Sequence, residues 1–148
     1  MAKINPYLNF KGNTEEAFNF YKSVFGGEFT ALMRFKDVPA SEEGCDGATI
    51  AEHEKEKIMH IALPLGGGNV LMATDVLESM SQNFKVGDNI SLSLNVDSRE
   101  ETDRLYNALS EDGSYQMPPA DAFWGDYFGM CVDQFGVRWM LSYNQNQK

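Results

Sequence analysis

The chain of 148 residues carries one pattern of residues twice, and this repetition limits the folds that it can adopt. The segment "GGNVLMATD" (67–75) is matched by "FGVRWMLSYN" (135–144), because each places a Met four residues after a Gly in a short apolar stretch. Together with three further matches in the same order, this pair indicates an internal duplication. The other matches pair "LNF" with "LNV", "EE" with "EE" and "FY" with "LY" (8–10 with 94–96, 15–16 with 100–101, 20–21 with 105–106).

The two halves also predict the same order of secondary structure. In the first half, apolar residues at helical spacing follow an Asn or Thr cap and stop at two glycines, and a similar capped pattern recurs in the second half. Short stretches that alternate apolar and polar residues predict the strands. Each half therefore predicts β-α-β-β-β, with strands at 4–10, 28–38, 57–65, 69–76, 89–97 and 137–144, at least one more within 114–136, helices at 13–27 and 98–113, and loops at 39–56 and 77–88.

Composition disfavours several classes of partner. A formal net charge of −10 with scattered basic residues works against binding to nucleic acid or to an anionic membrane surface. No apolar run approaches the roughly 18 to 20 residues that span a bilayer, and the first residues lack the pattern of a secretory signal. Cys45 and Cys131 lie far apart without metal-type spacing. We therefore expect a cytoplasmic protein with unpaired thiols and no nucleic-acid or membrane partner.

Three segments carry a resemblance to a known family: "NPYLNFKGNTEEAFNFYKSVFGGE", "MHIALPLGGGNVLMATD" and "FWGDYFGMCVDQFGVRWM". They resemble the PhnB-like branch of the vicinal oxygen chelate superfamily, which includes glyoxalase I, extradiol dioxygenases and the bleomycin and fosfomycin resistance proteins. The resemblance implies an α+β fold in which two tandem βαβββ modules form a half-barrel sheet with outer helices. It further implies one glyoxalase-like domain over 1–148, made of modules at about 1–80 and 88–148, and a homodimer.

The resemblance also implies where a metal ion would bind. Metal-binding members of the superfamily take one ligand, a His, Glu or Gln, from the first and from the last strand of each module. In this sequence those positions fall on Asn5, Met72, Ser91 and Met140. Neither a thioether nor a hydroxyl is a strong ligand for a hard or borderline divalent cation. We therefore expect no metal and no cofactor.

Strand alternation directs further side chains, Tyr7 among them, into the predicted cavity. His60 points away from the apolar side of its strand and is either a hydrogen-bonded structural residue or a substrate contact and general base. Arg138 either anchors an anionic ligand or reaches solvent. The aromatic segment 114–127, with Trp124, is either a lid over a small molecule or a plug at the barrel mouth.

The acidic segment "EEGCDGATIAEHEKE" (42–56) has a simpler interpretation. It lacks the ordered spacing of oxygen ligands that a Ca²⁺ loop needs, so we expect a solubilising loop. His53 lies within it, and we expect a solvated side chain there.

Three functional hypotheses follow from these residues. The leading one is metal-independent binding of a small organic molecule in the half-barrel cavity. The alternative is a metal-dependent lyase, isomerase or dioxygenase that uses His60 with a partner such as Asp75 or Glu28, and a third is a structural dimer filled by its own aromatic residues. The ligand-binding set of the leading hypothesis is Asn5, Tyr7, His60, Met72, Ser91, Trp124, Arg138 and Met140, with His60 as the best catalytic candidate.

Overall fold

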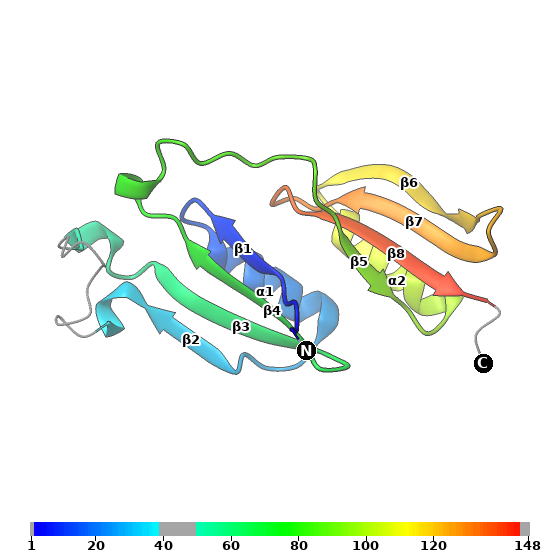
Figure 1. The fold of residues 1–148 in the computed structure, drawn as a ribbon, viewed down its shortest axis with the longest axis horizontal. Coiled ribbons are helices and arrows are strands. Elements are labelled where there is room, and N and C mark those ends of the chain that lie inside the picture. The colour runs from blue at the N-terminus through cyan, green and yellow to red at the C-terminus, as the bar shows by residue number, and fades with distance from the viewer. Residues whose placement is uncertain (1, 39–49, 146–148) are drawn as a thin grey trace. The chain divides into compact units, whose positions relative to one another are not determined.

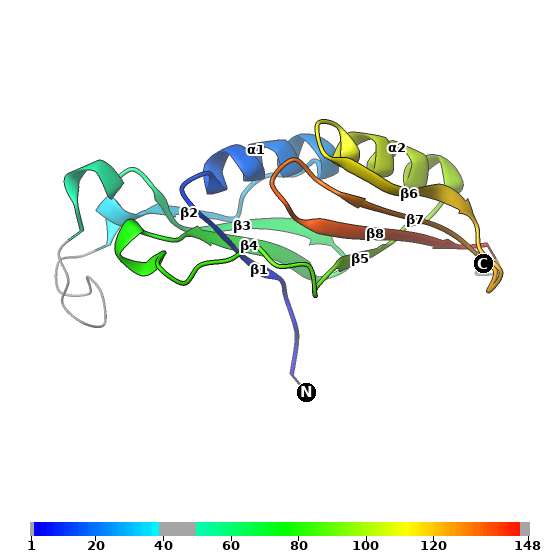
Figure 2. The ribbon, with the colours of Figure 1, turned by 90° about the horizontal axis from the view of Figure 1, so that it is seen from above.

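The computed structural model describes residues 2–38 and 50–145, and the chain divides into two compact units, Met1–Phe84 (unit 1) and Lys85–Lys148 (unit 2). Each unit is a four-stranded sheet with one helix packed on one of its faces (Figure 1, Figure 2). Both helices have 12 residues. Within the described parts of the chain, no helix combines the length and the apolar character needed to cross a membrane.

Unit 1 has the predicted order of elements. In its sheet the strands lie in the order β1-β4-β3-β2, with β1 and β4 parallel and the other neighbours antiparallel. Among the described residues of this unit, three single turns of 3₁₀-helix lie outside the sheet. The elements are β1 (Tyr7–Phe10), α1 (Thr14–Phe25), β2 (Ala31–Arg34), η1 (Phe35–Asp37), η3 (Glu52–Glu54), β3 (Ile58–Gly66), β4 (Asn69–Asp75) and η4 (Glu78–Met80).

Unit 2 repeats this arrangement with its strands in the order β5-β8-β7-β6, again with the first pair parallel. Its elements are β5 (Leu92–Asn95), α2 (Arg99–Ser110), β6 (Ser114–Asp121), β7 (Asp126–Val132) and β8 (Arg138–Asn144). The register repeats as well, because Tyr7 lies beside Met72 in unit 1 and Ser93 lies beside Met140 in unit 2. The predicted α+β fold with a duplicated βαβββ order is confirmed, and each sheet is open with two edge strands.

Alternation along the central strands separates the two faces of each sheet. In β4, the side chains of Leu71, Ala73 and Asp75 are buried, whereas those between them are half-buried. In β8, Trp139 and Leu141 are buried in the same way. The buried positions meet the apolar stripe of the unit's own helix, which is the pattern expected for a sheet covered on one face.

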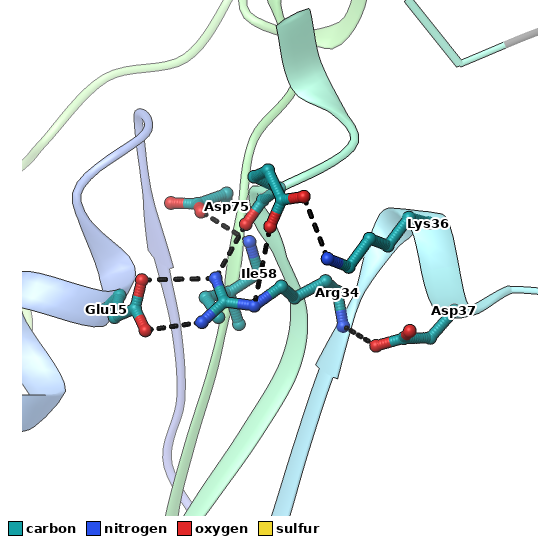
Figure 3. A network of polar contacts seen from close by, with 7 residues as sticks. Glu15, Arg34, Lys36, Asp37, Ile58 and Asp75 are labelled. Carbon is teal, nitrogen blue, oxygen red and sulfur yellow. Dashed lines mark hydrogen bonds and ion pairs between the residues drawn. The ribbon is translucent and has the colours of Figure 1, made fainter. Parts of the chain in front are cut away.

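The N-terminus of α1 is held by a buried carboxylate from another strand. Asp75, at the end of β4, is 2% exposed and accepts hydrogen bonds from the backbone N–H of Thr14 (3.0 Å) and of Ile58 (2.8 Å). Figure 3 shows the bond to Ile58. Asn13 occupies the predicted N-cap position of α1, but its side chain makes no cap bond. In unit 2, by contrast, the Ser98 hydroxyl caps α2 by accepting from the N–H of Glu101.

An arginine joins the same end of α1 to β2 and β3 (Figure 3). The Arg34 guanidinium donates to both carboxylate oxygens of Glu15, at 3.1 and 2.6 Å, and to the backbone carbonyl of Glu56 at 2.7 Å. The hydrogen bond from Arg34 lowers the pKa of the Glu15 carboxyl from its usual value. This bidentate pair is the geometry for which guanidinium is best suited, and it fixes the helix relative to the edge strand.

Three predicted elements differ from the structure. The strand predicted at 28–38 covers only Ala31–Arg34, because Phe35–Asp37 form the 3₁₀ turn η1. Residues 4–6, which the sequence analysis placed in the first strand, lie outside β1, and Ile4 is 90% exposed, because the parallel ladder with β4 starts only at Tyr7. The segment 114–127 is a β-hairpin and not a loop, with β6 and β7 paired around a turn at 122–125. Its two prolines are tolerated because β6 is an edge strand, and Gly129 leaves room for Pro119, whose Cγ would lie 3.0 Å from an added Cβ.

The substitution Asp75→Ala removes the acceptor from two buried N–H groups. We expect a loss of about 2–4 kcal/mol in the free energy of unfolding, since each buried donor left without a partner costs about 1–3 kcal/mol. Urea denaturation followed by circular dichroism measures it. Asn13→Ala is the matched control and should change stability by less than about 0.5 kcal/mol, whereas equal effects of the two substitutions would show that Asp75 does not hold the helix.

Candidate functional site

The face of the unit 1 sheet opposite α1, which we call the open face of unit 1, holds two of the polar candidates, Tyr7 and His60. Two rows of side chains cross it, as the strand registers show. Both rows include half-buried or exposed side chains of β1, β3 and β4. The first row is Tyr7, Met72, Ala62 and Ala31, and the second is Asn9, Thr74, His60 and Met33.

A hydrogen bond joins two of the predicted site residues across this face. The Tyr7 hydroxyl lies 3.1 Å from Nδ1 of His60, and the two rings are stacked with centroids 5.7 Å apart. Tyr7 belongs to β1 and His60 to β3, and β4 lies between these strands. The side chains of Tyr7 and His60 therefore approach each other above β4. They meet between the positions of Met72 and Thr74 on that strand.

The chemistry of this pair follows from the protonation of each ring. Burial raises the pKa of the Tyr7 phenol above its usual value, so the hydroxyl stays neutral near pH 7. When the hydroxyl donates to Nδ1, the neutral imidazole carries its proton on Nε2 and offers a donor to a ligand. In the other tautomer Nδ1 donates to the phenol oxygen, and Nε2 becomes an acceptor and a base. Tyr7 thus orients the imidazole in both cases.

The positions of the metal ligands implied by the resemblance hold other groups in unit 1. Met72 lies on the open face beside Tyr7. Asn5 precedes β1, and its side-chain oxygen accepts a hydrogen bond of 3.2 Å from the backbone N–H of Val70, which ties the first residues of the chain to β4. A thioether and an engaged amide do not make a site for a divalent ion.

The corresponding face of unit 2 is lined by methionines. Ser93, Met140, Met130 and Met117 follow one another across β5, β8, β7 and β6. Ser91 comes just before β5 and is half-buried. This face offers soft, adaptable apolar contact and, at the predicted ligand positions, no carboxylate or imidazole. The donor sets of the two units, each taken by itself, therefore do not fit the metal centre that the resemblance implies.

A carboxylate that the sequence analysis missed lies on the same face of unit 2. Asp126 Oδ2 accepts from the Ser142 hydroxyl at 2.9 Å and from the indole N–H of Trp124 at 3.2 Å. The indole packs edge-to-face with Phe128 at a centroid distance of 5.5 Å and is 53% exposed. Trp124 therefore lies in the hairpin turn, anchored by Asp126. Recognition of β7 as a strand would have placed Asp126 and Phe128 on one face by alternation.

Arg138 lies at the start of β8 and is half-buried. Its Nη2 reaches only the side-chain oxygen of Gln116, at 3.5 Å, and its buried Nε has no acceptor among the residues that the structure describes. A guanidinium with an unused donor is suited to an anionic group. Arg138 could therefore bind an anionic ligand, which is one of the two roles that the sequence analysis considered for it.

The two partners suggested for His60 in an enzyme are engaged elsewhere. Asp75 is buried on the helix side of β4 and binds two backbone N–H groups. Glu28 is exposed and pairs with Lys22 at 2.9 Å. Met33 is a neighbour of His60 that the sequence analysis did not name, although the alternation in 28–38 would have put it on the open face.

Of the two cysteines, Cys45 lies outside the described residues, and Cys131 is buried on the helix side of β7. Burial, with a smaller contribution from the carboxylate of Asp133, raises the pKa of the Cys131 thiol to about 11. A thiol that is neutral at physiological pH and closed to solvent cannot act as a nucleophile.

Comparisons with known proteins agree with this architecture. A family model described as "3-demethylubiquinone-9 3-methyltransferase" matches residues 2–142. The crystal structure of protein PA1353 from Pseudomonas aeruginosa is 41% identical, with a TM-score of 0.82, over 99% of this chain and 100% of that one. The PhnB protein from Bacillus cereus is 27% identical, with a TM-score of 0.72, over 96% and 99%.

A more distant solved structure supports the fold alone. A glyoxalase/bleomycin resistance protein/dioxygenase family enzyme from Burkholderia phytofirmans PsJN is 14% identical, with a TM-score of 0.59, over 93% of this chain and 96% of that one. The fold predicted from the resemblance, that of the glyoxalase/bleomycin resistance proteins, is confirmed.

In the variant Cys45→Ser, only Cys131 remains to react with a thiol reagent such as Ellman's reagent. Because its pKa is raised to about 11, we expect almost no reaction at pH 8 in the native protein and one equivalent after denaturation. A fast reaction of one equivalent in the native protein would contradict the buried position of Cys131.

Proposed function

Because the chain belongs to the family described as "3-demethylubiquinone-9 3-methyltransferase" and is similar to a PhnB protein, we propose that it shares the glyoxalase-like scaffold but binds a small organic molecule without a metal ion. The proposed site is the open face of unit 1. The observation that carries the proposal is the hydrogen bond between Tyr7 and His60, which holds an imidazole in one orientation on a face where the expected metal ligand is Met72.

The side chains around this pair suggest the kind of ligand. His60 Nε2 supplies one donor or acceptor, and the Tyr7 ring supplies an aromatic surface that is 46% exposed. Met72 and Met33 give adaptable apolar contact, and Ala31 presents only a methyl group, whereas Ala62 is buried beneath this face. A compact molecule with one polar group and an apolar part fits this set best. In unit 2, Ser91, Trp124, Arg138 and Met140 remain proposed ligand contacts of the same type.

The competing functions have less support in the contacts. A metal-dependent lyase, isomerase or dioxygenase would need strong ligands beside His60, and Asp75 and Glu28 are engaged elsewhere. Methyl transfer, which the family description names, commonly relies on a nucleotide-type cosubstrate, and the sequence has no glycine-rich motif for one. Neither activity is therefore part of the proposal.

The proposal includes a homodimer in the cytoplasm. A large apolar side chain lies exposed on the edge strand β2, where Leu32 is 40% exposed, and a second copy would cover it. The unpaired thiol of Cys131 suits a reducing compartment. Sedimentation equilibrium at micromolar concentration tests the dimer, and a single species of 16.6 kDa would contradict it.

A thermal-shift screen of small metabolites in the presence of a chelator tests the binding site. We expect at least one compound to raise the melting temperature of the wild type, since ligands that bind only the folded state stabilise it. His60→Gln should weaken the binding of that compound by about fivefold or more, because a ligand hydrogen bond contributes about 1 kcal/mol. Tyr7→Phe, which frees the imidazole, should weaken it less.

Ser93→Ala is the matched control, because Ser93 occupies in unit 2 the position that Tyr7 has in unit 1. It should leave the affinity unchanged if the site lies on the open face of unit 1. Binding that disappears with the chelator, or that survives His60→Gln at full strength, would refute the proposal.

A further inference from the structure

We propose that His53, Glu54 and Glu78 of unit 1 form a binding site for a divalent transition-metal ion of the Zn²⁺ class, at a place that the family resemblance does not suggest. His53 and Glu54 belong to η3, shortly before β3 begins, and Glu78 opens η4, shortly after β4 ends. Both turns lie at the same end of the unit 1 sheet (Figure 1). Neither turn contributes to the open face, so this proposal does not depend on the proposed function.

The three side chains converge on one point. One ligand atom of each, a ring nitrogen or a carboxylate oxygen, lies within 4.8 Å of the other two. His53 Nε2 and Glu78 Oε2 are only 3.3 Å apart. Metal–ligand bonds of about 2.0–2.1 Å in a tetrahedral site place neighbouring ligands about 3.3 Å apart, so this pair already has the spacing of two zinc ligands. Glu54 needs a small adjustment of its carboxylate to join them.

The burial of Glu54 is the independent observation that points to a bound cation. This residue is only 5% exposed, and one carboxylate oxygen accepts a hydrogen bond of 2.9 Å from the backbone N–H of Glu78. Within residues 2–38 and 50–145, the other oxygen has no hydrogen-bond donor and the carboxylate has no lysine or arginine partner. The nearby Lys55 pairs with Glu52 at 2.9 Å.

A buried carboxylate without a positive partner is costly, and a second carboxylate beside it adds repulsion. Both costs fall when a divalent cation binds between Glu54 and Glu78. In the described part of the acidic segment, Glu52 and Glu56 do not share this property, because they are exposed and lie in ion pairs with lysines. The burial of Glu54 is therefore the property that favours a specific ion site here over a charged loop that only keeps the protein soluble.

The ligand types select the ion. An imidazole nitrogen with two carboxylates suits Zn²⁺, Co²⁺, Ni²⁺ or Mn²⁺, whereas Ca²⁺ and Mg²⁺ prefer oxygen ligands alone. His53 and Glu78 have side chains that are 61% and 67% exposed, so the ion would keep water in its remaining positions and exchange readily. The bound ion would tie the two turns together across 25 residues of sequence and stabilise the ends of β3 and β4.

The sequence analysis expected a solvated His53, and its exposure agrees with that. The sequence analysis missed Glu78 as a third ligand for the pair His53 and Glu54. Glu78 lies far from this pair in sequence, and the β3–β4 hairpin brings it close. The sequence analysis expected no metal, because it weighed only the strand positions and the spacing of ligands within the acidic segment, where it rejected a Ca²⁺ site.

Isothermal titration of tag-free, chelator-treated protein with Zn²⁺ tests the site, and the visible absorption of bound Co²⁺ reports its ligands. We expect one ion per chain in the wild type. His53→Gln and Glu78→Gln should each weaken binding by at least about tenfold, because each removes one of three protein ligands. Far-ultraviolet circular dichroism of both variants checks that they fold.

Two matched controls keep the test specific. Glu52→Gln removes one charge from the same turn outside the cluster, and it should change the affinity by less than about twofold, as expected of an exposed charge. His60→Gln removes the other histidine and should have no effect on the ion.

Absence of Zn²⁺ binding up to about 1 mM, which corresponds to roughly 4 kcal/mol, would overturn the proposal. Wild-type affinity in both His53→Gln and Glu78→Gln would overturn it as well. Loss of the ion in His60→Gln alone would place it on the open face, and that result would contradict both this site and the metal independence of the proposed function.

Discussion

Unit 1 depends on the buried carboxylate of Asp75 more than on any other single group. A helix leaves its first N–H groups without partners, and α1 has no side-chain cap of its own to satisfy them. Asp75 supplies that acceptor from the end of β4 and also binds the first N–H of β3. One side chain thereby fixes three elements relative to one another. Arg34 then clamps the first turn of α1 to the edge strand from the other side.

The arrangement on the open face is a consequence of this anchoring. Once the end of β4 is fixed, the parallel ladder with β1 puts Phe10 beside Asp75 and Tyr7 beside Met72. The hairpin of β3 and β4 then sets His60 near Thr74, within reach of the Tyr7 hydroxyl. A contact between residues 53 positions apart in sequence thus follows from two strand registers. Unit 2, whose helix has its own serine cap, carries methionines and a carboxylate on the equivalent face and no such pair.

Much of the fold could be predicted from the sequence because its signals are local and occur twice. Two βαβββ units, the face of each central strand and the start of α2 follow from alternation, spacing and the cap at Ser98. The hairpin of β6 and β7 was missed because prolines and aromatic residues gave it the composition of a loop, and only its position at the sheet edge makes them acceptable there. Ile4 was assigned to the strand by polarity alone, yet the ladder that would have buried it starts three residues later.

The candidate sites were less predictable, for a physical reason. Alternation shows which face a side chain occupies, and it correctly put Tyr7, His60 and Met72 on one side. It gives no distances, so the stacking of Tyr7 on His60, the engagement of Asp75 and the approach of Glu78 to His53 were invisible. Each of these contacts depends on the register between paired strands, which alternation within one strand does not give. The strand register decides which neighbours a side chain has, so the sequence around one residue cannot show whether it is solvated or takes part in a site.

The central claim is that the imidazole of His60, oriented by Tyr7, meets a small organic molecule without help from a metal ion. Long-range ¹H–¹⁵N NMR spectra resolve the imidazole rings, and the chain has two histidines, so His53 serves as an internal reference. The direct measurement adds a protein-free extract of cellular small molecules to labelled protein in a chelating buffer. The account predicts that the ring signals of His60 shift while those of His53 stay in place. Unmoved His60 signals, or shifts that appear only after a divalent ion is restored, would contradict it.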